Sequence, residues 1–223
     1  MLITADLLVL ALDDTSGRAV ASQNLDLLTG AGLVVDLALA EAIRIRQGRW
    51  KTWYVSVFDD ARVDDPVLVD AVEVLSEKER ALTSAFTLLG RQRPAVLARL
   101  AQHEILSEVR GKALGLFPTQ RWPAVDGRHK AELVADIRAA LGDGAAPSER
   151  TATLISLLNA SSGLAPYAKF EHLKPKQVKA RADEISSSST VAAELRQVLE
   201  ATAASIAMAG ATAGAAGDGG GGG

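Results

Sequence analysis

The chain has 223 residues, with 24 Lys and Arg against 27 Asp and Glu, and its hydrophobic fraction of 48% suffices for one substantial core or two small ones. The absence of cysteine excludes a disulfide framework, thiolate metal sites and a cysteine nucleophile. A secretory signal would need a basic start, whereas the first apolar stretch opens at Met1 with no Lys or Arg before it. We therefore expect a cytoplasmic protein.

Two apolar runs dominate the N-terminal part of the chain. They cover residues 7–12 and 33–40, and a loop that contains Gly17 follows the first run. Each run is too short to span a bilayer, which requires roughly 20 consecutive apolar residues. Asp6 and Asp36 also accompany the two runs. The pattern therefore predicts two buried helices joined by a loop.

Residues 43–57 show the pattern of a β-hairpin. β-branched and aromatic residues occur in 43–46 and 52–57, on either side of a segment centred on Gly48. A turn at this glycine would pair the two segments.

Helices are expected in the next part of the chain. Asp65 can cap a helix whose first position is Pro66, and the apolar spacing of that helix stops near Ser76. Further helices are predicted over residues 83–89 and from Pro94 onward.

A second hairpin is predicted within residues 107–126, with Gly111 and Lys112 as its turn. A charged amphipathic helix is then expected over 127–141, and another helix begins at Ser148.

The C-terminal part of the chain predicts two more helices, over residues 175–185 and 190–208. Thr190 is a candidate N-cap of the second. The composition then changes to Ala, Thr and Gly, so residues 210–223 are expected to form a disordered tail. Residues 1–209 are expected to form a single, mainly α domain with a central helical bundle and two small β-hairpins.

Charge is distributed unevenly along the chain. Acids predominate in residues 1–42, residues 43–58 contain bases without an acid, and residues 91–130 are predominantly basic. If folding brings the two basic stretches together, they would present one basic face to an anionic partner. Scattered, solvated charge is the alternative, and the spacing alone leaves both open.

The titratable residues form no recognisable catalytic pattern. His103, His129 and His172 are widely separated and lack partners at metal-ligand spacing, so we expect surface or cap roles for them. Turns and N-caps also explain the paired acids more simply than cation binding does. These pairs are Asp13-Asp14, Asp59-Asp60 and Asp64-Asp65. We expect a non-enzymatic protein without a cofactor or metal.

Several segments of the chain, taken in order, resemble those of a known protein family. Residues 2–14 with Gly17 come first, followed by residues 32–39, the Asp-Asp-Pro helix start at 64–66, and Gly115-Leu116-Phe117-Pro118-Thr119 with Trp122-Pro123. This order resembles the Golgi phosphoprotein 3 family, including its bacterial members, over about residues 1–205. The resemblance implies a mostly helical fold and binding of phosphatidylinositol 4-phosphate at membrane surfaces rather than catalysis.

The resemblance also implies a headgroup pocket. In eukaryotic members a Trp and an Arg before the second core helix join two Arg near a later helix start. An ungapped reading places the first Trp and Arg at Ala21 and Gly30, so both are absent here. Of the later pair, Arg93 matches, while the other position falls on Gly90 beside Arg91. Arg91 and Arg93 are therefore the implied ligands, for phosphatidylinositol 4-phosphate or another anionic phospholipid.

The second hairpin has a composition suited to a membrane surface. Basic groups attract anionic headgroups by about 1 kcal/mol each, and exposed apolar side chains can enter the interface. The basic residues are Lys112 and Arg121, and the apolar residues are Leu114, Leu116, Phe117 and Trp122. Packing of these apolar residues into the core or a subunit contact remains the alternative. The resemblance also implies self-association through this hairpin.

Two other classes of function fit parts of the sequence. Arg91, Arg93 and Arg99 followed by a basic hairpin could form a winged-helix unit that binds nucleic acid. The acidic total charge and the lack of a clear recognition helix argue against it. A protein-interaction module that oligomerises or binds a protein cargo is the other alternative. We rank a cytoplasmic, peripherally membrane-associated lipid-binding protein first, the interaction module second and the nucleic-acid binder third.

Overall fold

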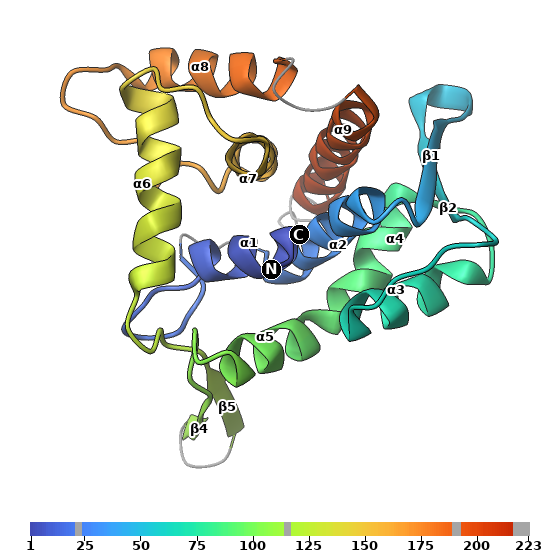
Figure 1. Cartoon of the computed structure of the whole chain (residues 1–223), viewed down its shortest axis with the longest axis horizontal. Coiled ribbons are helices and arrows are strands. Elements are labelled where there is room, and N and C mark those ends of the chain that lie inside the picture. Colours follow the sequence, from blue (N-terminus) through green and yellow to red (C-terminus); the bar gives the residue numbers. More distant parts are fainter. Residues whose placement is uncertain (21–23, 114–116, 189–192, 216–223) are drawn as a thin grey trace, which may run out of the picture.

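Helices α1 (Ile3–Ala11) and α2 (Leu25–Leu39) cross the middle of the molecule, and the other helices lie around them (Figure 1). The computed structural model describes residues 1–20, 24–113, 117–188 and 193–215. Over these residues the fold is mainly helical with two small antiparallel sheets, which confirms the predicted fold class.

The remaining elements follow in chain order. They are β1 (Ile43–Gln47), η1 (Arg49–Lys51), β2 (Trp53–Val57), α3 (Pro66–Ser76), β3 (Arg80–Ala81), α4 (Leu82–Leu89), η2 (Gly90–Gln92), α5 (Arg93–Gln102), β4 (Val109–Ala113), β5 (Phe117–Arg121), α6 (Arg128–Gly142), α7 (Glu149–Ala160), α8 (Pro175–Ser187) and α9 (Ala193–Ala215).

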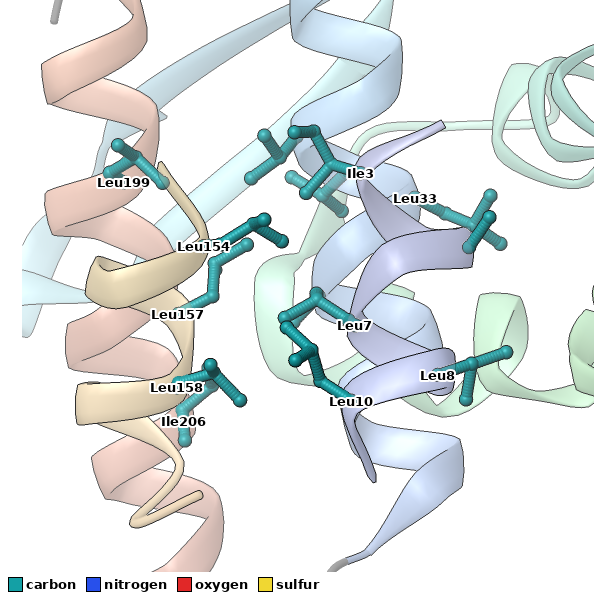
Figure 2. Packing of buried hydrophobic residues seen from close by; sticks show 14 of the residues in the cluster. Ile3, Leu7, Leu8, Leu10, Leu33, Leu154, Leu157, Leu158, Leu199 and Ile206 are labelled. Carbon is teal, nitrogen blue, oxygen red and sulfur yellow. The ribbon is translucent and has the colours of Figure 1, made fainter. Parts of the chain in front are cut away.

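The two apolar runs form the buried centre, as the sequence predicts. All residues of α1 are buried, because α2, α5, α6 and α7 contact it from different sides. Figure 2 shows Leu7 and Leu10 of α1 pointing toward α7. The labelled side chains of this cluster are Ile3, Leu7, Leu8, Leu10, Leu33, Leu154, Leu157, Leu158, Leu199 and Ile206. Burial of this apolar surface is the main term that stabilises the fold.

Asp36, inside the second apolar run, caps the first helix. Its carboxylate accepts hydrogen bonds from the backbone N–H groups of Ile3 (2.7 Å) and Thr4 (2.9 Å), and from the Thr4 hydroxyl (2.5 Å). Leu2, at the N-cap of α1, has no polar side chain for this role. Burial raises the pKa of Asp36, and the hydrogen bonds from Thr4 and Ile3 oppose that rise.

Asp6 joins three helices through a buried carboxylate. Its side chain is 0% exposed, with Oδ1 at 2.8 Å from Nε2 of His129 and Oδ2 at 2.7 Å from Nε of Arg150. Arg150 also donates to the Leu2 carbonyl at 3.2 Å. The expected surface or cap role is therefore wrong for His129, because its ring bonds a carboxylate that is remote in the sequence.

The first hairpin is confirmed. β1 and β2 pair antiparallel with Gln47 opposite Trp53, and β3 adds a third short strand to the free edge of β2. The second hairpin is also present, but its predicted turn at Gly111 and Lys112 is wrong. These residues pair with Thr119 and Pro118 inside the strands. Glycine suits position 111 because a Cβ there would lie 3.2 Å from the Thr119 hydroxyl oxygen.

Local capping signals place the helix starts correctly. The Asp65 carboxylate accepts from the Val67 N–H at 3.0 Å, and α3 starts at Pro66 and ends at Ser76. Ser148 likewise accepts from the Thr151 N–H at the start of α7. Thr190, the candidate N-cap of the last helix, lies outside the described residues.

The last helix extends beyond the expected end of the domain at residue 209. α9 continues to Ala215, so the expectation that residues 210–215 belong to a disordered tail is wrong. Alanine has the highest helix propensity and occupies much of this segment, which favours continuation of the helix. The remaining residues of the expected tail, 216–223, lie outside the described part of the chain.

Candidate functional site

A pocket opens where the loop between α1 and α2 meets the first turn of α5 and the end of β5. Its volume is about 330 Å³, and its described lining contains Arg18 and Arg93 but no carboxylate. We call it the Arg18–Arg93 pocket. The other lining residues are Leu12, Gly17, Ala19, Leu25, Pro94, Leu97, Gln120 and Trp122. The pocket thus combines two guanidinium groups with apolar side chains.

Gly17 lets the loop lie directly against the end of the second hairpin. Its φ is +63°, and a Cβ at this position would lie 2.3 Å from the backbone nitrogen of Trp122. The Trp122 N–H donates to the Gly17 carbonyl at 3.1 Å. The Arg18 carbonyl in turn accepts from the Asp13 N–H at 2.8 Å. These contacts fix the backbone of Arg18, while its side chain stays exposed beside the pocket.

Arg93 reaches the pocket from the first residue of α5. Its Nη1 lies 2.9 Å from Oδ1 of Asp26, in the first turn of α2. The close approach depends on Gly90, where a Cβ would lie 2.5 Å from the Asp26 carbonyl oxygen. Because both side chains of this ion pair are partly solvated, the pair contributes about 1 kcal/mol or less. An incoming anion can therefore displace the Asp26 carboxylate from Arg93.

Two larger cavities are lined by basic side chains that form ion pairs with aspartates. One, of about 450 Å³, contains Arg99 and Asp65, whose side chains bond each other at 2.7 Å. The other, of about 470 Å³, contains Arg128 and Lys130. These two bases pair with Asp126 and Asp14 respectively. Arg18, by contrast, has no ion pair with the described residues, so the Arg18–Arg93 pocket is the better candidate for binding an anion, although Arg93 pairs with Asp26.

Comparison with known families agrees with the segment order. A family model described as Golgi phosphoprotein 3 (GPP34) matches residues 3–202, nearly the whole chain. The chain belongs to the Golgi phosphoprotein 3 family. A search of the curated proteins returned no match.

Packing explains two departures from the headgroup pocket that the Golgi phosphoprotein 3 resemblance implies. A Cβ at Gly30 would lie 2.2 Å from the Phe86 carbonyl oxygen, and Gly90 has the close contact with Asp26 described above. Neither position can accept an arginine without moving the backbone of a neighbouring helix. Ala21, at the expected Trp position, lies outside the described residues.

The structure brings together a different pair of arginines from the expected one. Arg93 lines the pocket, whereas Arg91 is exposed on η2 and is not among the lining residues. Arg18 is the second arginine of the pocket, although the sequence did not single it out. The available signal was its position directly after Gly17 in the loop between the two apolar runs.

Only part of the second hairpin can contact a partner as expected. Lys112 and Arg121 are exposed, but Trp122 is 6% exposed and belongs to the core, so its expected entry into a membrane interface is wrong. The contact between its backbone and Gly17 holds this end of the hairpin against the loop between α1 and α2. Leu114 and Leu116 lie outside the described residues, and the structure describes the backbone but not the side chain of Phe117.

The two basic stretches do not form one face. The hairpin of β1 and β2 lies at the upper right of Figure 1, whereas β4 and β5 lie at the lower left. The basic face expected from residues 43–58 together with 91–130 is therefore wrong, because the central helices separate the two hairpins. Arg99, considered for a winged-helix contact, is bonded to Asp65.

Among the described residues, no group of three or more His, Asp or Glu is placed to hold a metal ion. No helix in the described part of the chain has the length and apolarity needed to cross a bilayer.

Proposed function

We propose that the protein attaches peripherally to anionic membranes by binding lipid phosphate in the Arg18–Arg93 pocket, and that it acts by binding rather than catalysis. The observation that carries the proposal is the convergence of Arg18 and Arg93 on one open pocket whose described lining has no carboxylate. Membership of the Golgi phosphoprotein 3 family supports a role connected with lipid.

The chemistry of the pocket suits a phosphorylated headgroup. Guanidinium groups form paired hydrogen bonds with phosphate oxygens and remain charged at all physiological pH values. Leu12, Leu25 and Leu97 supply apolar surface beside them, as a headgroup attached to a glycerol backbone requires. Because the implied Trp and first Arg are replaced by Ala21 and Gly30, we propose recognition of anionic phospholipids in general rather than strict selection of phosphatidylinositol 4-phosphate.

Vesicle sedimentation tests the proposal. The protein is mixed with vesicles of phosphatidylcholine alone, with added phosphatidylglycerol, or with added phosphatidylinositol 4-phosphate, at two salt concentrations. We expect binding to both anionic vesicles and little binding to the neutral ones. Arg18→Ala and Arg93→Ala should each weaken binding about fivefold, since a basic group near an anionic surface contributes about 1 kcal/mol.

Two controls separate the pocket from general surface charge. Arg62→Ala removes an exposed arginine far from the pocket in sequence, and Arg91→Ala removes the exposed neighbour of Arg93. Both should have smaller effects than the pocket variants. Equal effects of all four variants would reject the pocket in favour of diffuse charge. Binding to duplex DNA without binding to any vesicle would reject the lipid function itself.

A further inference from the structure

The tip of the first hairpin exposes a tryptophan. Trp50 is 94% exposed, whereas the other two tryptophans of the chain, Trp53 and Trp122, are 9% and 6% exposed. Arg49 and Lys51, on either side of Trp50, are exposed as well. We call residues 49–51 the hairpin tip. A large apolar side chain that contacts so little of its own protein leaves most of its surface for a partner.

The hairpin holds this tip in a defined conformation. The Gly48 N–H donates to the Thr52 carbonyl at 2.7 Å, and the Thr52 N–H donates to the Arg49 carbonyl at 3.2 Å. Trp50 and Lys51 both have left-handed φ values, 60° and 59°. This region costs a non-glycine residue about 1 kcal/mol or more, which no burial of the indole repays. The strain therefore points to a role for the outward tryptophan.

Some basic side chains of the first hairpin contact other side chains of the protein, and others do not. The guanidinium of Arg44 lies 4.9 Å from the centre of the Phe58 ring. That of Arg46 lies 5.0 Å from the centre of the Tyr54 ring and bonds the Glu79 carboxylate. By contrast, the side chains of Arg49 and Lys51 make no hydrogen bond or ion pair with the described residues. The charge available to an outside partner is thus concentrated beside Trp50.

We infer that the hairpin tip is a membrane-insertion point, at which Trp50 enters the interface of an anionic bilayer and Arg49 and Lys51 bind lipid phosphates. Tryptophan is favoured at the boundary between headgroups and acyl chains because its ring is amphipathic. Basic residues on either side add attraction to anionic lipid. A stable protein interface buries about 800 Å² on each partner, which is more than a three-residue tip offers alone.

This contact is separate from the Arg18–Arg93 pocket. Figure 1 shows the first hairpin projecting away from the central helices, on the opposite side of them from β4 and β5. The inference rests on the proposed function, which identifies an anionic membrane as the partner. Its test must therefore distinguish failure of the tip from failure of the pocket.

The distribution of the tryptophans provides a direct readout. Full-length protein is titrated with vesicles of phosphatidylcholine and phosphatidylglycerol while tryptophan emission is recorded, with and without bromine on the acyl chains. We expect a shift of the emission to shorter wavelength and quenching by the brominated lipid, both from Trp50, because Trp53 and Trp122 are already buried. Trp50→Asn should abolish both signals, since asparagine tolerates the left-handed conformation.

Sedimentation of the same variants measures the contribution to binding. Trp50→Asn should weaken vesicle binding about tenfold, from the apolar area lost to the interface. Lys51→Gly should weaken it about fivefold, and glycine also accepts the φ of this position without strain. Val125→Asn removes another exposed apolar side chain and should change neither signal. Circular dichroism and thermal unfolding of each variant check that it is folded.

The outcomes separate the two contacts. Vesicle binding without quenching, or with quenching that persists in Trp50→Asn, overturns the inference and leaves the pocket intact. Quenching that persists at saturating lipid after Arg18→Ala with Arg93→Ala supports the tip, and unchanged vesicle sedimentation of that double variant counts against the pocket. No binding to any vesicle overturns both. Self-association that is lost in Trp50→Asn, without a response to vesicles, would assign the tip to a second copy of the chain and overturn the membrane inference.

Discussion

The Asp36 carboxylate in α2 accepts hydrogen bonds from both the backbone N–H and the hydroxyl of Thr4 in α1. A third bond, from the Ile3 N–H, completes the contact. A buried acid thus supplies the N-terminal cap of a different helix. Gly32 makes this possible, because it brings the backbone of α2 against Thr4.

Asp36→Ala should lower the free energy of unfolding by about 2–4 kcal/mol, because it leaves two buried N–H groups without an acceptor. Urea titration followed by circular dichroism measures the change. Asp70→Ala, which removes an exposed acid from α3, is the matched control and should cost less than about 0.5 kcal/mol. A loss as small as that control at Asp36 would contradict the capping role.

Arg150→Met should destabilise the protein by about 2 kcal/mol, since Asp6 would lose one partner of its buried carboxylate. Adding Asp6→Asn should recover part of this loss, because a neutral amide is less costly to bury than an unpaired charge. The two single variants and the double variant form a thermodynamic cycle that urea titration can measure. Purely additive effects would argue against coupling between the two residues.

Alkaline pH should destabilise the protein through Tyr167. Its hydroxyl donates to the buried Leu10 carbonyl, and burial raises its pKa to about 12. An unfolded tyrosine ionises near pH 10, so the stability from this group is present below pH 10 and lost as pH rises toward 12. The melting temperature of Tyr167→Phe should therefore fall less steeply than that of the unaltered protein over this range. Parallel curves would refute the assignment, and Tyr54→Phe serves as the comparison.

Asp26→Asn should strengthen binding to anionic vesicles. The change removes the carboxylate that pairs with Arg93 and leaves the arginine free for lipid phosphate. We expect about a two- to fivefold increase, the range that a solvated ion pair of 1 kcal/mol or less allows. Asp70→Asn changes the net charge equally at a remote site and should have a smaller effect. Weaker binding by Asp26→Asn would show that Asp26 organises the pocket rather than competing for it.

Elements that depend on neighbours in the sequence were predictable. The starts of α3 and α7 follow from Asp65, Pro66 and Ser148, which act within their own first turns. The burial of α1 and α2 also follows from their apolar runs. These features require no knowledge of distant contacts, and the structure agrees with them.

Features that join distant segments were not predictable from spacing. The contact of Asp6 with His129 and the shared pocket of Arg18 and Arg93 depend on how the helices pack. Composition also could not tell which tryptophan is exposed. Trp122 follows a hairpin whose composition suits a membrane surface, yet its side chain is buried. Trp50 lies in a hairpin predicted from its pattern of β-branched and aromatic residues, and its side chain is exposed.

The cap on α1 has a consequence for synthesis. A helix as short as α1, with nine residues, is marginal in water by itself. During translation it emerges from the ribosome before α2, and its capping carboxylate follows more than thirty residues later. The N-terminal segment, although apolar, therefore has to wait for α2 before it can fold. An early ribosome-bound chain would expose this segment to chaperones until Asp36 emerges.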